Sequence, residues 1–236
     1  MRKARYEVIL ADTPETQRVH FRLRYLVFCQ EKGFESADAF PSGQETDEHD
    51  RYALHFLIRQ GGTNTAWFGA VRLLLPADRP RPIERLCKLQ YDLDRARTGE
   101  VSRLILTQQA PREAHLPLYL LCQAIHQAGT EHGLDHMLFL IRPGLRRFLD
   151  HRGLRLRRFG EPCSHRGLRL PCGNHMDALQ YGLFNWRKKE GYPEHVLLPT
   201  FRRASALAKS ESQPAASRQA VPPYSPPPNV APSALP

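Results

Sequence analysis

Short apolar runs alternate with amphipathic stretches along most of the chain, and this alternation restricts the folds that the chain can adopt. The runs that predict strands lie at residues 6–11, 53–59, 66–75, 100–107, 135–141, 154–159 and 178–184. Apolar residues recur at helical spacing in residues 14–32, 116–132 and 144–151. This order of elements predicts an α/β protein with a mixed sheet and helices on both of its faces.

The composition changes sharply near residue 204. From there to residue 236 the chain consists mainly of Ala, Ser, Gln and Pro and ends in PPYSPPPNVAPSALP. Such a segment buries too little apolar surface to offset the entropy that ordering costs. We therefore expect one folded domain over residues 1–203, followed by a disordered tail over residues 204–236.

The cysteines and the apolar runs indicate a reducing compartment. The cysteines stand singly at Cys29, Cys87, Cys122, Cys163 and Cys172, and their odd number argues against a disulfide framework. Residues 1–6 are charged rather than apolar, so no secretory signal is expected there. The longest apolar runs, about ten residues, are too short to span a bilayer. These features predict a cytoplasmic protein with no transmembrane segment.

The chain carries a formal net charge of +10. A basic protein of this size often binds an anionic partner, which can be nucleic acid, a membrane surface or an acidic protein. A dense basic stretch runs over residues 142–158, where seven arginines occur. No motif that reads a nucleic-acid groove accompanies it, so we expect no nucleic-acid partner.

Several charged residues lie where apolar neighbours are expected. Arg72 interrupts the strand-like run AWFGAVRLLL, and Arg24 lies beside the apolar face of the first predicted helix. A charge in such a place is costly unless it is paired, and the nearby loop supplies Glu45, Asp47 and Asp50. This pattern predicts a buried network of arginines and carboxylates, which is a candidate functional site.

A second group of polar residues, Glu100, Ser102 and Arg103, opens an otherwise apolar strand. Strand alternation predicts that Glu100 and Ser102 lie on one face and that Arg103 lies on the other. A carboxylate at a strand end beside a cleft can act as a general base, so Glu100 is the candidate for that role. An ion pair with an arginine is the structural alternative.

These residues occur in an order that resembles two related families. The run 22–28 (RLRYLVF) followed by Gly33 and Phe34 resembles the first helix of the acyl-homoserine-lactone autoinducer synthases. The spacing Glu45-x-Asp47-x-x-Asp50 resembles the PEP-CTERM/exosortase system-associated acyltransferases, which are related to N-acyl amino acid synthases. Residues 69–73 and 100–103 resemble motifs of both groups, whereas residues 165–171 (HRGLRLP) resemble the second group only.

The resemblance covers residues 6–184 and implies the GNAT acyltransferase fold. In that fold a central mixed sheet splays open and holds the pantetheine arm of the acyl donor. The splay is expected between residues 104–107 and residues 136–139. The resemblance, together with this expected splay, assigns catalytic roles to Glu100, Ser102 and Arg103, and substrate-binding roles to Arg24, Phe28, Phe34, Asp47, Asp50, Arg72, Leu104, Ile105, Leu106, Thr107 and Phe139.

The resemblance also implies the substrates. We expect transfer of a fatty acyl group from a carrier-protein thioester to the amine of an amino acid or similar small molecule, with a link to a PEP-CTERM/exosortase system. Acyl-phosphopantetheine, on acyl carrier protein or coenzyme A, would be the donor, with no bound cofactor. Residues 108–114 contain no glycine, unlike the pyrophosphate loop of ordinary GNAT enzymes, which favours the carrier protein.

Other interpretations of the sequence remain open at this point. An autoinducer synthase using S-adenosylmethionine is the first alternative, although Phe34 stands where such enzymes usually have tryptophan. A non-catalytic basic binding module is the second. Cys163-x-His165 with Cys172-x-x-His175 has the elements of a zinc site, but its spacing is short, and we expect no metal. A cysteine nucleophile lacks any activating sequence context.

Overall fold

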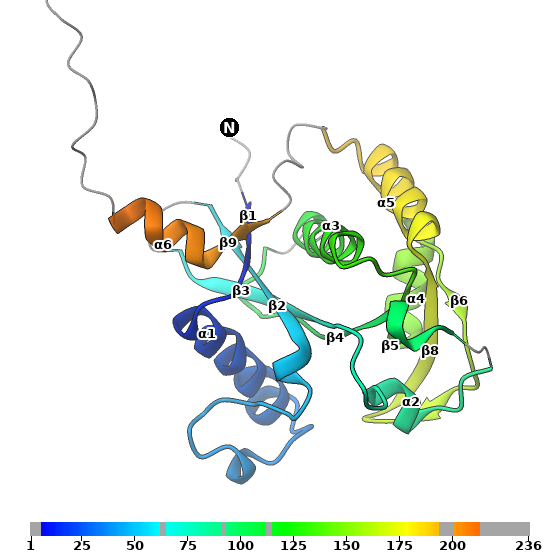
Figure 1. Ribbon diagram of the computed structural model, residues 1–236, viewed down its shortest axis with the longest axis horizontal. Coiled ribbons are helices and arrows are strands. Elements are labelled where there is room, and N and C mark those ends of the chain that lie inside the picture. Colours follow the sequence, from blue (N-terminus) through cyan, green and yellow to red (C-terminus); the bar gives the residue numbers. More distant parts are fainter. Residues whose placement is uncertain (1–5, 62–64, 91–92, 112–114, 194–200, 213–236) are drawn as a thin grey trace, which may run out of the picture.

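The computed structural model describes residues 6–61, 65–90, 93–111, 115–193 and 201–212 (Figure 1). A mixed sheet with the order β6-β8-β5-β4-β3-β2-β1-β9 forms its centre, and β7 pairs with β8 beside this path. Neighbouring strands are antiparallel except for the parallel pairs β4–β5 and β1–β9. The strands are β1 (Tyr6–Leu10), β2 (Ala53–Gln60), β3 (Trp67–Leu74), β4 (Thr98–Leu106), β5 (His136–Ile141), β6 (Arg157–Arg158), β7 (Cys163–Ser164), β8 (Leu168–His175) and β9 (Arg202–Arg203).

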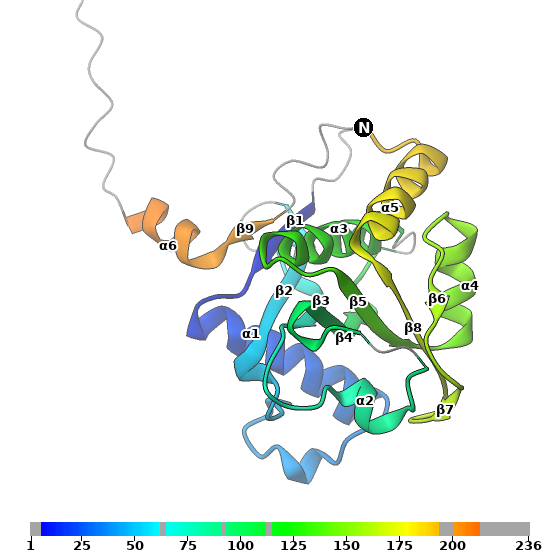
Figure 2. The same cartoon turned by 45° about the vertical axis from the view of Figure 1, so that its right-hand side comes forward.

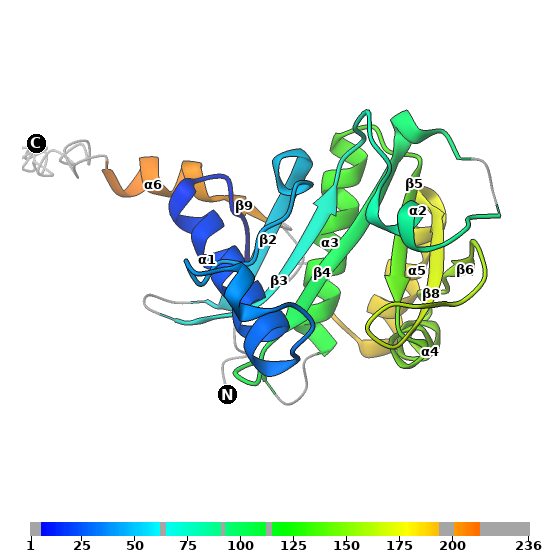
Figure 3. The same cartoon turned by 90° about the horizontal axis from the view of Figure 1, so that it is seen from below.

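Helices cover both faces of the sheet. They are α1 (Pro14–Arg24), which continues as a π-helical segment (Tyr25–Glu31), α2 (Pro82–Leu86), α3 (His115–Glu131), α4 (Pro143–His151), α5 (Met176–Glu190) and α6 (Ala204–Ser212). Figure 1 and Figure 3 show α1 and α2 on one face of the sheet and α3 and α5 on the other. The α/β fold class predicted from the sequence is therefore confirmed.

The first helix begins and ends as its sequence indicates. Thr13 adopts an extended backbone and accepts a hydrogen bond from the N–H of Thr16, which caps the helix. Pro14 occupies the first turn, where its missing N–H costs nothing. Gly33, with φ of 58°, adopts the left-handed conformation after the π-helical segment. The helix therefore delivers its last turn, and Phe28 with it, to the middle of the sheet.

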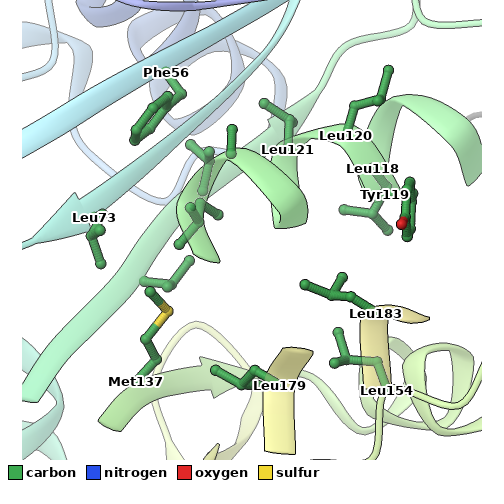
Figure 4. Close-up of a cluster of buried hydrophobic side chains, with 14 of the residues drawn as sticks. Phe56, Leu73, Leu118, Tyr119, Leu120, Leu121, Met137, Leu154, Leu179 and Leu183 are labelled. Atoms are coloured by element: carbon green, nitrogen blue, oxygen red, sulfur yellow. The ribbon is translucent and has the colours of Figure 1, made fainter. Parts of the chain in front are cut away.

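Strand alternation sorts the core into two layers. Phe56 and Ile58 of β2 pack toward α3, whereas Leu57 between them packs toward α1. Because both faces are covered, β2 is apolar at successive positions rather than at every second one. Figure 4 shows the larger layer, in which side chains of α3 meet Leu179 and Leu183 of α5.

The sheet splays between β4 and β5. These parallel strands pair from Thr98 with His136 to Val101 with Phe139, and the pairing stops there. Each strand then pairs only with its outer neighbour, β3 or β8. The split therefore opens beyond Phe139 on β5, whereas the sequence predicted it along residues 136–139, which are the paired part of that strand.

The structure corrects two predicted elements near the end of the domain. Residues 178–184 belong to helix α5 rather than to a strand, because Met176, Leu179, Leu183 and Trp186 bury one helical face. The strand in this region is β8, whose sequence LRLPCGNH contains Pro171 and Gly173, residues that disfavour strands. Only Arg157–Arg158 of the strand expected at residues 154–159 pairs, with β8.

The start of the predicted tail is also ordered. Residues 204–212 form α6, and the N–H of Ser205 donates to the Asp12 carboxylate at 2.8 Å. Burial of Ala204 against the small apolar layer explains why the chain docks here. Residues 213–236 lie outside the described residues. Among those that are described, no helix is both long and apolar enough to cross a membrane.

Candidate active site

A β-bulge in β4 organises the polar side of the site. Ala70 pairs with Ile105 and Arg72 pairs with Ser102, so two residues of β4, Arg103 and Leu104, oppose one residue of β3. Arg103 has φ of 54°, the left-handed conformation that is uncommon for a residue with a side chain. The bulge turns the Arg103 side chain to the same face as Ser102, so the face predicted for Arg103 from simple alternation is wrong.

Three arginines and three carboxylates meet on this face. We call them the charge cluster, and its members are Arg24, Arg72, Arg103, Glu45, Asp47 and Asp50. Arg24 donates to Glu45 and, at 2.6 Å, to Asp50. Arg72 Nη1 donates to Asp47 at 2.6 Å and to Asp50 at 2.7 Å, while its Nε donates to Ser102 Oγ at 3.0 Å.

Arg103 closes the charge cluster on its outer side. Its guanidinium donates to Glu45 at 2.8 Å and to Asp47 at 3.1 Å. The side chains of Arg24 and Arg72 are fully buried, and that of Glu45 is 1% exposed. Every charge of the cluster therefore has an opposite charge in contact, which is the condition for keeping charges inside a protein.

The electrostatic balance keeps the carboxylates of the charge cluster ionised. Burial alone would raise the pKa of Asp47, but the adjacent Arg72 outweighs it and holds that pKa well below its usual range. Burial is likewise outweighed at Asp50 by Arg24 and Arg72, so its pKa is lowered. With three positive and three negative charges the cluster is neutral in sum.

Glu100 lies on β4, like Arg103, but outside the charge cluster. It is 2% exposed, and its carboxylate accepts a hydrogen bond from the N–H of Ile83 in α2 at 3.1 Å. No arginine or lysine of the described residues forms an ion pair with it. Burial raises its pKa to about 7, against which the Ile83 N–H and more distant arginines act only in part. Glu100 can therefore gain or lose a proton near neutral pH.

A cavity of about 400 Å³ passes through the split of the sheet beside Glu100. On the α1 side its wall includes Phe28 and Phe34, whose rings stack with centroids 6.3 Å apart. On the α3 and α5 side the wall is almost entirely apolar, and it is formed by Leu118, Cys122, Ile125, Leu145, Leu149, Leu154, Leu179 and Leu183. The arrangement joins a polar end at Glu100 to a long apolar interior.

Three further arginines line the cavity where it reaches the surface. We call Arg142, Arg166 and Arg169 the rim arginines. The guanidinium groups of Arg142 and Arg166 lie 5.5 and 5.9 Å from the centroid of the Phe34 ring. Arg166 also forms an ion pair with Glu35. Among the described residues no carboxylate lies within ion-pair distance of Arg142 or Arg169.

The residues predicted from the sequence divide into three groups in the structure. Arg24, Asp47, Asp50 and Arg72 belong to the charge cluster but are not among the residues that line the cavity. Arg103 belongs to the cluster and lines the cavity, and Ser102 lines the cavity and accepts a hydrogen bond from Arg72 of the cluster. The remaining cavity residues that were predicted are Phe28, Phe34, Glu100, Leu104, Ile105, Leu106 and Phe139.

Thr107 stands apart from these groups. It does not line the cavity, because β4 ends at Leu106 and the Thr107 N–H donates to the carbonyl of Phe68 at 2.8 Å. The Thr107 side chain instead accepts a hydrogen bond from the N–H of Gln109. A direct role for Thr107 in substrate binding is therefore not supported by its position.

Sequence reasoning missed the apolar helix residues of the cavity and the position of the rim arginines beside it. The run of residues 165–171 singled out Arg166 and Arg169, but only as part of a resemblance, and Arg142 was noted only as part of the basic stretch over residues 142–158. Another member of that stretch, Arg152, is buried and contacts His115 and Glu190. The available signal in the sequence for these three arginines was that none of them has an acidic residue beside it in the chain.

The cysteines do not form a nucleophile or a zinc site of the kind considered above. Burial raises the pKa of Cys122 to about 12, so its thiol stays protonated. Cys163 lies beside Cys87, with 2.7 Å between the sulfur atoms, and Cys172 pairs with Phe139 in the sheet. Within the described parts of the chain, no three His, Cys, Asp or Glu side chains gather as metal ligands.

Comparison with known proteins agrees with this geometry. Residues 23–120 match the family model described as the acetyltransferase (GNAT) domain. The crystal structure of the AHL synthase LasI superposes with a TM-score of 0.63 at 17% identity, covering 77% of this chain and 95% of that one. No curated protein sequence matches the chain.

Two further solved structures share the fold. The CoA-dependent acyl-homoserine lactone synthase BjaI, solved with SAM and isopentyl-CoA, has a TM-score of 0.62 at 18% identity, covering 88% of this chain and 99% of that one. FeeM, an N-acyl amino acid synthase from uncultured soil microbes, has a TM-score of 0.54 at 12% identity, covering 79% and 94%. The chain therefore has the fold of the GNAT acyltransferases, and the matched domain indicates that it is an acyltransferase.

Proposed function

We propose that the enzyme transfers a fatty acyl group from a carrier-protein thioester to the amine of an amino acid or a similar small molecule. The observation that carries the proposal is the cavity through the split sheet, which joins a buried carboxyl group to an apolar interior. A short acyl group would leave most of that interior unfilled. A fatty chain would gain about 0.8 kcal/mol for each methylene that it buries there.

Glu100 is the general base of the proposed reaction. An amine must lose a proton to attack the thioester carbonyl, and a base works best when its pKa is near the operating pH. Burial raises the pKa of Glu100 to about 7, which meets that condition. Glu100 lines the cavity, so it can take the proton directly or through one water molecule.

The bulge in β4 supports the second requirement, which is stabilisation of the oxyanion. Because Arg103 and Leu104 together oppose one residue of β3, the ladder leaves a backbone N–H of the bulge free of a partner strand. Both residues line the cavity. Such a donor, aimed at the thioester oxygen, contributes about 3 kcal/mol to transition-state stabilisation.

An acidic carrier protein as donor is supported by surface charge. Arg147 on α4 and Arg155, Arg157 and Arg158 after it are exposed on the part of the fold that adjoins β5 and β8. Exposed charges of one sign steer an oppositely charged partner and raise its association rate. Residues 108–114 contain no glycine, unlike the pyrophosphate loop of ordinary GNAT enzymes, which also favours the carrier protein, and residues 112–114 lie outside the described residues.

Residues 165–171 are the reason to place this enzyme beside a PEP-CTERM/exosortase system. That part of the proposal rests on the sequence resemblance. The autoinducer synthase is the second candidate, and the fold shared with LasI and BjaI is the observation that favours it. In that case the acceptor would be S-adenosylmethionine rather than an amino acid.

Mass spectrometry of lipid extracts from cells that express the enzyme tests the proposal, with cells expressing Glu100→Gln as the control. We expect new N-acyl amino acids that are absent from the control. Purified enzyme with acyl carrier protein or coenzyme A thioesters of the same chain then identifies the donor. Acyl-homoserine lactones as the only new products would replace the proposal with the autoinducer reaction. Transfer from coenzyme A thioesters alone would exclude the carrier protein as the acyl donor.

A further inference from the structure

The positive charge of the rim arginines is only partly balanced by nearby carboxylates. Arg142, Arg166 and Arg169 line the same cavity, and Glu35 is the acid in contact with them among the described residues. Glu35 is shared, since it also lies 4.0 Å from Arg103. Neighbouring like charges are costly, and the pKa of Arg169 is lowered by burial and then by Arg142 and Arg166. An anion placed between these groups would relieve that cost.

The geometry of the rim favours a planar or tetrahedral oxyanion. Arg142 and Arg166 lie against the ring of Phe34, which limits the positions of both guanidinium groups. Arg169 projects from β8 opposite Cys163 in the β7–β8 hairpin, where its side chain is partly buried. Guanidinium groups fixed in this way present paired N–H donors, and such donors match carboxylate and phosphate oxygens.

The charge cluster cannot supply this function in place of the rim. The guanidinium of Arg103, the arginine of the cluster that lines the cavity, already donates hydrogen bonds to Glu45 and Asp47. Arg24 and Arg72 are fully buried and paired. A substrate anion would therefore have to enter a fully buried network whose charges are already balanced, whereas at the rim it meets Arg142 and Arg169, which have no carboxylate partner among the described residues.

We infer that Arg142, Arg166 and Arg169 form an oxyanion-binding site that holds a negatively charged group of a substrate at the mouth of the acyl cavity. The inference rests on the proposed function, because the cavity must hold an acyl chain for the anion to reach the rim. Two sources share this chemistry. One is the carboxylate of an amino-acid acceptor, and the other is the phosphate of the phosphopantetheine arm.

Isothermal titration calorimetry with two matched pairs of probes separates these sources. The first pair is N-decanoylglycine and its neutral analogue N-decanoylglycinamide. The second is S-decyl-phosphopantetheine and S-decyl-pantetheine, which differ by the phosphate. We expect N-decanoylglycine to bind about tenfold more tightly than the amide, because two arginine contacts to a carboxylate are made only by the acid. A preference within the second pair would assign the site to the donor phosphate.

A double variant, Arg142→Gln with Arg169→Gln, should abolish the preference for the charged member of either pair. Arg22→Gln with Arg51→Gln removes the same charge from exposed residues outside the cavity and should keep the preference. Equal binding of charged and neutral probes by the unaltered enzyme, or a preference that survives in the double variant, would overturn the rim site while leaving the acyl cavity intact. Binding of none of the probes would overturn the cavity and the rim site together.

Discussion

Two groups of arginines adjoin the same cavity and have opposite electrostatic surroundings. The charge cluster has three arginines matched by three carboxylates, with Arg24 and Arg72 fully buried. The rim arginines have one carboxylate among them and are partly exposed. A balanced buried network has no unmatched charge to offer a substrate, so it can hold the bulge and the loop of residues 45–50 in place. The unbalanced group is the one that can recognise a ligand.

Glu100 stands between these two extremes. Glu100 is 2% exposed and so nearly as buried as Arg24 and Arg72, but its carboxyl group accepts a hydrogen bond only from the backbone N–H of Ile83 among the described residues. Burial without a matching cation is why its pKa is raised rather than lowered, unlike those of Asp47 and Asp50. The lack of compensation at a buried position, rather than charge density, is therefore the reason for proposing Glu100 as the base.

The largest expected effect is on the charge cluster. Glu45→Gln leaves Arg24 and Arg103 without their shared carboxylate and should lower the free energy of unfolding by about 4 kcal/mol, as when one partner of a buried ion pair is removed. Denaturant unfolding followed by circular dichroism measures this change.

Glu48→Gln is the matched control for this loss. Glu48 is about half exposed and pairs with Arg79 and Arg85 on the surface, so its loss should leave the unfolding midpoint unchanged. A stable Glu45→Gln protein with a raised KM for the acceptor would instead make the charge cluster a binding site and erase the distinction drawn above.

Glu100→Gln tests the uncompensated carboxyl group and should lower kcat by about 100-fold, because the amine loses its base. In the unaltered enzyme kcat/KM should rise with pH up to about 7 and level off above it, as Glu100 loses its proton. Initial rates across pH 5–9, about two pH units to each side of that pKa, measure both effects. A variant that keeps full activity and the same pH profile would exclude Glu100 as the base.

The same shift predicts how stability depends on pH. The pKa of Glu100 is raised in the folded state above its ordinary value of 4.5, so the folded protein holds a proton that the unfolded chain releases. The contribution of Glu100 to stability is therefore fully present below pH 4.5, falls as pH rises to about 7, and is constant above that. The difference in unfolding free energy between Glu100→Gln and the unaltered protein should change over that window.

Much of this arrangement could be predicted from the sequence, for a physical reason. Arg72 lies within an apolar strand, where an unpaired charge would cost much free energy. The acidic residues of the preceding loop were the nearest possible partners, so their pairing with Arg72 could be predicted. The side to which Arg103 points could not be predicted, because one extra residue in β4 reverses the alternation on which the prediction was based. Nothing in the local sequence marks that bulge.

The apolar helix side of the cavity could not be predicted for a different reason, and the split itself was expected only from the family resemblance. Apolar residues such as Leu118 and Leu179 have the same helical spacing whether they fill a core or line a space within it. The split of the sheet, which decides between these outcomes, is a relation between β4 and β5 and not a property of either strand. The rim arginines depend on the same relation, since Arg142 follows β5 and Arg169 lies on β8.

Cys122→Phe tests whether the apolar interior measures the acyl chain. Cys122 lies on α3 and lines the cavity, so a phenyl group there should exclude the end of a long chain. The rate with long-chain donors relative to short-chain ones should fall about tenfold, which corresponds to about two methylenes denied burial. Cys122→Ala keeps the space open and should leave the ratio unchanged. Equal ratios in the two variants would show that the acyl chain does not lie beside Cys122.

The smallest expected effect concerns Ser102, which connects the charge cluster to the cavity, because its hydroxyl accepts a hydrogen bond from Arg72 at 3.0 Å and the residue lines the cavity. Since Arg72 keeps its contacts to Asp47 and Asp50, Ser102→Ala should lower the unfolding free energy by only about 1 kcal/mol. If Ser102 supports the charge cluster, kcat should fall less than tenfold, and Ser102→Thr, which keeps the oxygen, should restore stability and rate together. A loss of 100-fold in kcat without a loss of stability would make Ser102 a catalytic residue and extend the reactive region into the cluster.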